Sequence, residues 1–262
     1  MARSPLMNVM IQAVTKAGRG MRRDFGEVEQ LQVSIKGPSD FVSAADRRAE
    51  DVLVRELQKG RPEIGFLLEE GGVIEGKDPS QRFIIDPLDG TTNFLHGIPQ
   101  FAVSVALEKN GNVVAGVVYN PVTDELFTAE RGQGAFLNDR RIRVAARRAL
   151  GDCVIGTGIT HRGKGDHEQF GRELRAVQTE VAGIRRLGAA ALDLAYVAAG
   201  RLDGFWERDL KPWDIAAGIL LIREAGGYVS DLNGRDEMLE RGHLVAGNEA
   251  VHKALLARLK AA

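Results

Sequence analysis

The sequence contains a single cysteine, Cys153, and this scarcity excludes several classes of protein. One thiol cannot form an internal disulfide framework, and it cannot supply a cysteine-rich zinc site. A chain without disulfides is typical of a reducing compartment, so we expect the protein in the cytoplasm.

Long apolar runs and an excess of one charge are also missing. No segment reaches the ~20 apolar residues that span a bilayer, and the amphipathic N-terminal stretch does not resemble a signal peptide. The 35 basic and 36 acidic side chains give a net charge of −1, so the whole molecule has no electrostatic attraction to nucleic acid or membrane. A small anionic substrate would therefore need a local positive site, formed by side chains, helix ends or metal ions.

The first half of the chain combines helical and strand patterns. Ser4-Pro5 is a typical helix start, and apolar residues follow it at helical spacing. A second helix is predicted over residues 44–57, with its apolar side chains on one face. After the short apolar run 83–85, an Asn110-Gly111 turn lies between two apolar segments, and this predicts a β-hairpin.

From residue 153 the sequence alternates short apolar runs with helical patterns. The predicted helices cover residues 166–179, 189–199, 212–225 and 248–259. The predicted strands cover residues 154–156, 228–230 and 244–246. We therefore expect an α+β first part, residues 1–147, and an α/β second part, residues 148–262, which share one closely packed, layered core.

One acidic segment is especially informative, and it reads Asp86-Pro87-Leu88-Asp89-Gly90-Thr91-Thr92-Asn93-Phe94. It follows the apolar run 83–85, and its proline and glycine shape a tight turn that lets Asp86 and Asp89 face one point. Two close carboxylates repel each other and take up protons unless a cation lies between them, and such oxygen ligands suit Mg²⁺. The amides from Gly90 onward open a predicted helix toward which a phosphate can point. The alternative is an ordinary β-turn, because Asp, Pro and Gly are common turn residues.

Three further acidic segments follow, and two of them have two interpretations each. Glu69-Glu70-Gly71-Gly72 follows an apolar stretch, and it is either a metal-binding or water-polarising site or a solvated acidic loop. Asp214 follows Pro212-Trp213 in the first turn of a predicted helix, where it either complements the helix dipole or binds a metal. Asp46 falls within the first turns of the helix predicted from residue 44.

Taken together, these four segments resemble the signature of the inositol monophosphatase family. Residues 86–94 are similar to its D-P-[IL]-D-G-T-T-N-F motif, and residues 213–227 are similar to its W-D-x-A-A-G…E-A-G-G motif. The stretch 183–200 resembles the bacterial branch in particular. The resemblance extends over nearly the whole chain. It implies a layered αβαβα sandwich of the inositol monophosphatase and fructose-1,6-bisphosphatase type.

The resemblance implies a phosphatase with two to three Mg²⁺ ions in each active site. The implied metal ligands are Glu69, Asp86, the main-chain carbonyl of Leu88, Asp89 and Asp214. The implied reaction is direct attack of a metal-activated water on phosphorus, without a phosphoenzyme intermediate. Glu69 and Thr91 would position that water, and Asp46 would hold the Thr91 hydroxyl.

The resemblance also implies a binding pocket for a small phosphorylated polyol. The amides of Gly90 and Thr91 would hold the phosphate. The other implied substrate contacts come from Asp89, Gly188, Ala189, Ala190, Glu207 and Lys36. Glu207 lies seven residues before Asp214, where the inositol-specific branch has a glutamate that binds ring hydroxyls. It favours myo-inositol 1-phosphate as the substrate, whereas the alternative for Glu207 is an ordinary surface acid.

The chain departs from the family pattern at several positions. Leu68 stands where many members have glycine, residues 157–160 lack a frequent aromatic-proline pair, and the loop 161–166 is rich in charge and glycine. These departures concern substrate preference more than catalysis. The alternative substrates are 3′-phosphoadenosine 5′-phosphate, fructose 1,6-bisphosphate, NADP and histidinol phosphate.

Possible macromolecular partners form the last set of expectations. Members of the family are commonly homodimers and are inhibited by lithium, so the resemblance implies both properties here. Arginines cluster within residues 140–148 and at Arg185-Arg186, so the non-enzymatic alternative is an RNA- or protein-binding factor that has kept the phosphatase fold. The complete acidic set favours the enzyme. The sequence gives no support for contact with nucleic acid or the transcription machinery, and we expect no membrane partner.

Overall fold

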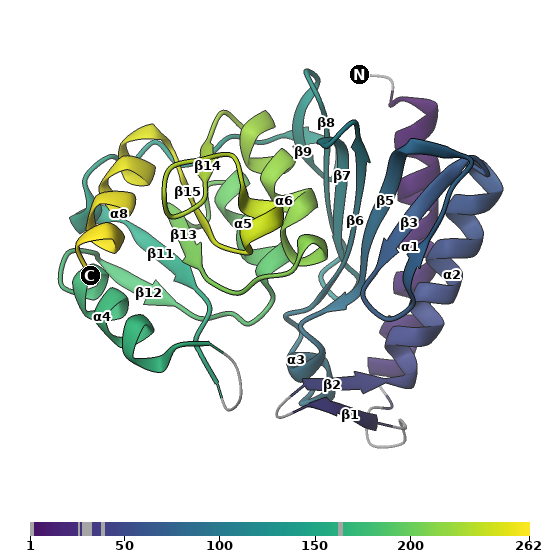
Figure 1. The fold of residues 1–262 in the computed structure, drawn as a ribbon, viewed down its shortest axis with the longest axis horizontal. Coiled ribbons are helices and arrows are strands. Elements are labelled where there is room, and N and C mark those ends of the chain that lie inside the picture. Colours follow the sequence, from purple (N-terminus) through teal and green to yellow (C-terminus); the bar gives the residue numbers. More distant parts are fainter. Residues whose placement is uncertain (1–2, 26, 28–32, 38–39, 162–164) are drawn as a thin grey trace.

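The computed structural model describes residues 3–25, 27, 33–37, 40–161 and 165–262, and the side chains of residues 33–43 lie outside that description. Two helices, a large sheet, two more helices, a smaller sheet and a last pair of helices follow one another as layers (Figure 1). This arrangement confirms the predicted αβαβα sandwich. Within the described ranges, no helix combines the length and apolar character needed to cross a membrane.

Helices α1 (Pro5–Phe25) and α2 (Ala44–Gly60) cover the outer face of the large sheet (Figure 1). Ser4 Oγ accepts a hydrogen bond of 3.0 Å from Met7 N, so the predicted capping hydroxyl begins α1. The apolar faces of both helices are buried against the sheet and include Met10, Val14, Leu53 and Leu57. In the segment that connects α1 to α2, β1 (Val33–Gly37) and β2 (Asp40–Ser43) form a separate antiparallel pair.

The large sheet has eight strands in the order β10-β9-β8-β7-β6-β5-β3-β4. Their bounds are β3 (Ile64–Leu68), β4 (Gly72–Ile74), β5 (Asp78–Asp89), β6 (Ala102–Lys109), β7 (Asn112–Asn120), β8 (Glu125–Glu130), β9 (Gly134–Leu137) and β10 (Arg140–Arg141). Neighbours pair antiparallel except β3 and β5, which are parallel. The predicted hairpin is confirmed as β6–β7, and its turn residues Asn110 and Gly111 both have positive φ, 50° and 72°.

Helices α5 (Ala190–Ala198) and α6 (Pro212–Glu224) lie between the two sheets. Both are apolar on nearly all sides, as expected for helices enclosed by protein. A Cβ atom on Gly116 of β7 would lie 3.1 Å from the Ala217 backbone, so glycine allows α6 to approach the large sheet closely.

The smaller sheet has five strands in the order β12-β11-β13-β15-β14. Its strands are β11 (Val154–Thr157), β12 (Gly183–Arg185), β13 (Gly204–Glu207), β14 (Tyr228–Ser230) and β15 (Leu244–Gly247). β11 is parallel to both neighbours, and β15 is antiparallel to both of its own. The predicted strands 154–156, 228–230 and 244–246 are confirmed.

The remaining helices complete the outer layer and the connections. They are α3 (Thr91–Leu95), α4 (His167–Gln178), α7 (Met238–Arg241), α8 (Glu249–Ala261) and a 3₁₀ turn (Leu150–Asp152). α4 and α8 cover the outer face of the smaller sheet, while α3 follows the end of β5 (Figure 1). The boundary after residue 147 stays a prediction, because both sheets share the helical layer between them.

Candidate active site

A pocket of about 200 Å³ lies where the two sheets approach each other. Its walls come from the turn after β3, the end of β5, the starts of α3, α5 and α6, and the end of β13. The predicted site residues in its lining are Glu69, Asp89, Gly90, Thr91, Gly188, Ala189, Ala190, Glu207 and Asp214. The fold therefore brings together acidic motifs that are far apart in the sequence.

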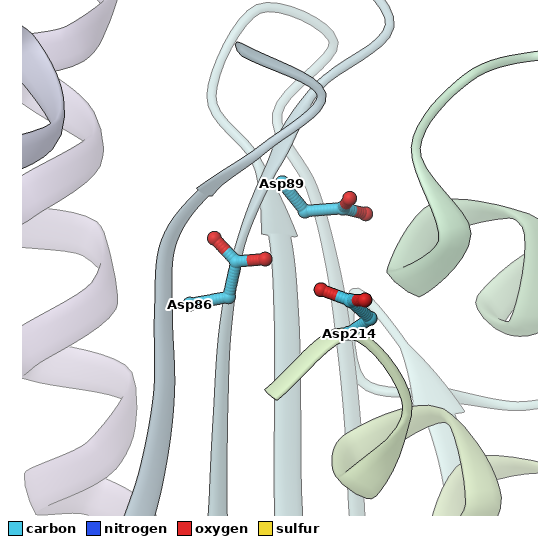
Figure 2. Close-up of side chains that lie close together, drawn as sticks. All are labelled: Asp86, Asp89 and Asp214. Atoms are coloured by element: carbon cyan, nitrogen blue, oxygen red, sulfur yellow. The ribbon is translucent and has the colours of Figure 1, made fainter. Parts of the chain in front are cut away.

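Three aspartates form an acidic cluster at this pocket. Asp86 and Asp89 come from the end of β5, and Asp214 comes from the first turn of α6 (Figure 2). One carboxylate oxygen from each residue lies within 4.8 Å of the other two. Asp86 and Asp89 are buried, so solvent does little to screen their mutual repulsion.

Burial raises the pKa of the Asp86 carboxyl well above its ordinary value, and the charges of Glu69 and Asp89 raise this pKa further. Burial likewise raises the pKa of Asp89, with the Asp214 charge as the next cause. Groups in such a position either hold protons or share a cation. A compact set of carboxylate oxygens is the donor chemistry of a hard divalent cation, so these residues fit a metal of that class.

Each aspartate of the cluster is fixed by one main-chain amide. Leu88 N donates to Asp86 Oδ1 (2.9 Å), Ala191 N donates to Asp89 Oδ2 (2.7 Å) and Lys211 N donates to Asp214 Oδ2 (2.7 Å). The last two donors lie at the starts of α5 and α6, where amides lack partners within the helix. Each side chain is thus oriented through one of its carboxylate oxygens.

Glu69 lies directly after β3 and beside the cluster. Its main-chain N donates a hydrogen bond of 3.2 Å to Ile85 O, so the end of β5 fixes its backbone. After burial, the charge of Glu69 is the largest cause of the raised pKa of Asp86. Neighbouring carboxylates repel each other, and a bound cation would remove that repulsion.

Thr91 begins α3 and contacts two groups behind the pocket. Its Oγ1 lies 3.1 Å from Asp46 Oδ1 and 3.1 Å from Leu88 O, and its single proton is donated to one of them at a time. The pairing of Thr91 with Asp46 is therefore formed. Gly90 precedes it with φ of 92°, and a Cβ atom there would lie 2.9 Å from Gln100 O. Only glycine satisfies both conditions.

The opposite wall of the pocket carries Glu207 at the end of β13. A Cβ atom on Gly158 would overlap the Glu207 carboxylate, so the absence of a side chain at Gly158 lets this carboxylate lie against the backbone. Gly188, Ala189 and Ala190 form the adjoining wall. Their small side chains leave space between Glu207 and the acidic cluster.

Asp193 is a pocket residue that sequence reasoning missed. It lies one turn after Ala189 and Ala190 on α5, and its side chain is 1% exposed. Its Oδ1 has no hydrogen-bond partner among the described residues. Burial raises the pKa of Asp193 well above its usual value, the Glu207 charge raises it further, and Arg186 lowers it. The helical spacing from the predicted pair Ala189-Ala190 is the signal that could have found it.

Comparison with known proteins decides the family. The inositol monophosphatase family matches residues 2–262 of the chain. A protein of Mesorhizobium japonicum named inositol-1-monophosphatase is 65% identical over 260 residues, which cover 99% of this chain and 98% of that protein. The chain belongs to the inositol monophosphatase family. This family consists of metal-dependent phosphatases, which agrees with the acidic cluster.

Two further relatives show the breadth of names within the family. A Pseudomonas aeruginosa protein named Nus factor SuhB is 46% identical over 260 residues, covering 98% of this chain and 96% of that protein. The crystal structure of the extragenic suppressor protein suhB from Bartonella henselae is 61% identical with a TM-score of 0.96, covering 98% of this chain and 99% of that one. The inositol monophosphatase fold of this chain is thus shared over its full length.

In this member of the inositol monophosphatase family, the predicted site residues lie at or next to the pocket, except Lys36, whose side chain is not described. Asp46, Asp86 and Leu88 contact the pocket residues from behind, and the other predicted residues line the pocket itself. Lys36 belongs to β1, but its side chain lies outside the described part of the structure. The individual roles of all these residues stay predictions.

Two connecting residues of the site were also missed. Asn93 Nδ2 donates to Gln100 O (2.7 Å) and to Leu187 O (2.8 Å), which ties α3 to the segment before α5. Ser104 Oγ donates to Trp213 O (3.2 Å), which ties β6 to the start of α6 beside Asp214. Asn93 lies within the family motif, whereas nothing in the sequence around Ser104 signals its contact.

Proposed function

We propose that this chain is a Mg²⁺-dependent phosphate monoester hydrolase whose substrate is myo-inositol 1-phosphate. The observation that carries the proposal is the cluster of buried Asp86 and Asp89 with half-buried Asp214, which has Glu69 and Thr91 beside it. The name of the Mesorhizobium japonicum relative, at 65% identity, supports the substrate.

The ligands of the proposed two to three Mg²⁺ ions come from the acidic cluster and its neighbours. Asp86 would bridge two ions, Glu69 and the Leu88 carbonyl would complete one site, and Asp89 and Asp214 would complete the other. Bound Mg²⁺ lowers the pKa of a water molecule and stabilises negative charge on the leaving oxygen. The hydrogen bonds of the aspartates to main-chain amides support this assignment, because they orient the side chains before a ligand binds.

The chain's own groups would position the water and the phosphate. While the Thr91 hydroxyl donates its proton to Asp46 or to Leu88 O, its oxygen can accept a hydrogen bond from the water. Glu69 would accept the second hydrogen bond of that water, and its carboxylate would be the base for the proton. The amides of Gly90 and Thr91 would hold the phosphate oxygens.

The wall opposite the acidic cluster supports a polyol as the alcohol half of the substrate. Glu207 and Asp193 are acceptors for hydroxyl groups, and both line the pocket. A buried acceptor without a partner, such as Asp193 Oδ1, costs about 1–3 kcal/mol, which a substrate hydroxyl would offset. The volume of about 200 Å³ and the small residues Gly188 to Ala190 leave room for a ring of the size of inositol.

The experiment that tests the proposal is phosphate release with Mg²⁺ from myo-inositol 1-phosphate, run beside the four alternative substrates. Wild type and Asp89→Asn are compared, and lithium is added as the inhibitor expected for the family. We expect a strong preference for myo-inositol 1-phosphate that is lost in the variant. Release from another compound alone would contradict the substrate, and release from none by folded protein would contradict the enzyme.

A second candidate role is that of a binding factor, favoured by the relative named Nus factor SuhB at 46% identity. Its test is the retention of RNA or of the transcription machinery by Asp89→Asn protein, with salt as the variable. Loss of hydrolysis with unchanged retention would establish two separable roles. The homodimer and the cytoplasm are further proposals from the family and from the single cysteine, and light scattering tests the first.

A further inference from the structure

Helix α2 carries two buried carboxylates on one side, Asp46 and Glu50. Residues four apart on a helix lie above one another on the same face. Asp46 is 1% exposed and accepts the hydrogen bond from Thr91, while Glu50 is 7% exposed and points to a different segment. The helix therefore contacts two parts of the active site through two acids one turn apart.

Glu50 holds the turn that follows Glu69. Its Oε2 accepts a hydrogen bond of 3.0 Å from Glu70 N. A Cβ atom on Gly71 would lie 3.0 Å from Glu50 Oε1, so a larger residue there would press on the carboxylate. Hydrogen bonds from amides to a charged acceptor are about twice as strong as neutral ones.

The backbone of Glu69 is thereby fixed from both sides. Ahead of it, its own amide donates to Ile85 O at the end of β5. On its C-terminal side, the amide of Glu70 donates to Glu50. Between these anchors the Glu69 side chain reaches the pocket and the carboxyl of Asp86.

We propose that Glu50 is a positioning residue for Glu69, and that α2 fixes Glu69 and Thr91 relative to each other through Glu50 and Asp46. The proposal rests on the proposed role of Glu69 as a metal ligand and water-positioning group. Without the Glu50 carboxylate, the amide of Glu70 loses its acceptor and the turn relaxes toward solvent. Removing a hydrogen-bond partner behind the ligands of a metal site typically costs 10–100-fold in metal affinity or activity.

The test compares Glu50→Ala and Glu50→Gln with Glu56→Gln as the matched control. Glu56 is on the same helix, but its carboxylate lies away from the pocket and forms an ion pair with Lys16, with 2.7 Å between Lys16 Nζ and Glu56 Oε1. Mg²⁺ affinity is measured by calorimetry on the folded proteins, and kcat and KM are measured with myo-inositol 1-phosphate. Thermal melting without Mg²⁺ reports any loss of stability separately.

We expect Glu50→Ala to weaken Mg²⁺ binding and to lower kcat by about 10–100-fold each, with KM changed less than about twofold. Glu50→Gln recovers part of both, because its amide oxygen can still accept the hydrogen bond from Glu70 N. Glu56→Gln behaves as wild type.

Wild-type Mg²⁺ affinity and kcat in folded Glu50→Ala would overturn the proposal, even if its melting temperature falls. If Glu50→Ala does not fold, wild-type values in Glu50→Gln overturn it in the same way. A wild type that binds Mg²⁺ but releases no phosphate contradicts the proposed function, while the calorimetric comparison still decides the role of Glu50. A wild type that binds no Mg²⁺ overturns both.

Discussion

The two walls of the pocket are built in different ways. On the wall of the large sheet, Asp86, Asp89 and Asp214 each accept a hydrogen bond from a main-chain amide. On the second wall, formed by α5 and the end of β13, Asp193 Oδ1 is buried without a partner among the residues described. The first wall is oriented before any ligand arrives, whereas the second has a polar atom that a ligand can satisfy.

This difference assigns catalysis to the first wall and substrate selectivity to the second. A metal site needs its ligands held within about 0.5 Å, which hydrogen bonds to helix and strand ends provide. A substrate site instead gains affinity when a ligand replaces missing hydrogen bonds. Among the departures from the family pattern, Gly158, Ile159 and Thr160 line the second wall, whereas Leu68 lies at the end of β3 next to Glu69 on the first. Substitutions on the two walls should therefore change different kinetic constants.

The largest effect is expected from Asp86→Asn on the metal wall. The amide cannot replace the charge of a carboxylate shared by two cations, so kcat should fall by about 10³-fold or more, equivalent to ~4 kcal/mol. Phosphate release at saturating Mg²⁺ measures the loss. Retention of more than a tenth of the activity would show that Asp86 is not a metal ligand.

Thr91→Val should produce the next largest loss, about 10²-fold in kcat, because the methyl group cannot orient the attacking water. Thr91→Ser keeps the hydroxyl and is the control. Mg²⁺ affinity should stay near wild type in both variants, since the Thr91 side chain is not a ligand. Equal activity of the two variants would contradict the role of the hydroxyl.

On the second wall, Asp193→Ala should raise KM for myo-inositol 1-phosphate by about tenfold, the value of about one hydrogen bond. The KM for p-nitrophenyl phosphate, which has no alcohol hydroxyl, should not change. Asp203→Asn is the control, because Asp203 is equally buried but bonds Val154 N and Arg147 away from the pocket. A parallel rise in KM for both substrates would contradict hydroxyl binding.

The smallest effect is a pH dependence of stability in protein freed of metal with a chelator. The pKa values of Asp86 and Asp89 are raised in the folded state, so between about 4 and those pKa values the folded protein binds more protons than the unfolded chain. Stability is then lost as pH rises through that window. Melting of wild type should fall by a few degrees relative to Asp86→Asn between pH 5 and pH 8.

Adding Mg²⁺ should abolish this difference for wild type, because the cation stabilises the ionised carboxylates. Mg²⁺ should have little effect on the melting temperature of Asp86→Asn. A relative stability that is flat with pH, or that rises with pH, would contradict the raised pKa values.

Elements with local signals were predictable from the sequence. The Asn110-Gly111 turn fixed the β6–β7 hairpin, and Ser4-Pro5 fixed the start of α1. Strands β12 and β13 were not predicted, because three or four residues between helical patterns carry too little periodicity. The residues of the metal wall were predictable because they lie within the motifs that resemble the family signature.

Contacts set by the order of strands and helices were not predictable. Glu50 meets the turn after Glu69 only because α2 packs against β3 and β5. Ser104 reaches Trp213 only because α6 crosses the large sheet, and the two residues are 109 positions apart. Asp193 was identified as a candidate substrate contact from its burial and from the lack of a partner for its Oδ1 among the described residues, neither of which a sequence pattern shows.

The most direct test of the metal wall is an anomalous difference map from crystals of the protein soaked in Mn²⁺, which takes similar oxygen ligands. We expect peaks between the carboxylates of Asp86, Asp89 and Asp214, with Glu69 and Leu88 O within ligand distance, and their loss in Asp86→Asn. Ordered side chains without a peak among them, or a peak elsewhere in the pocket alone, would contradict the account.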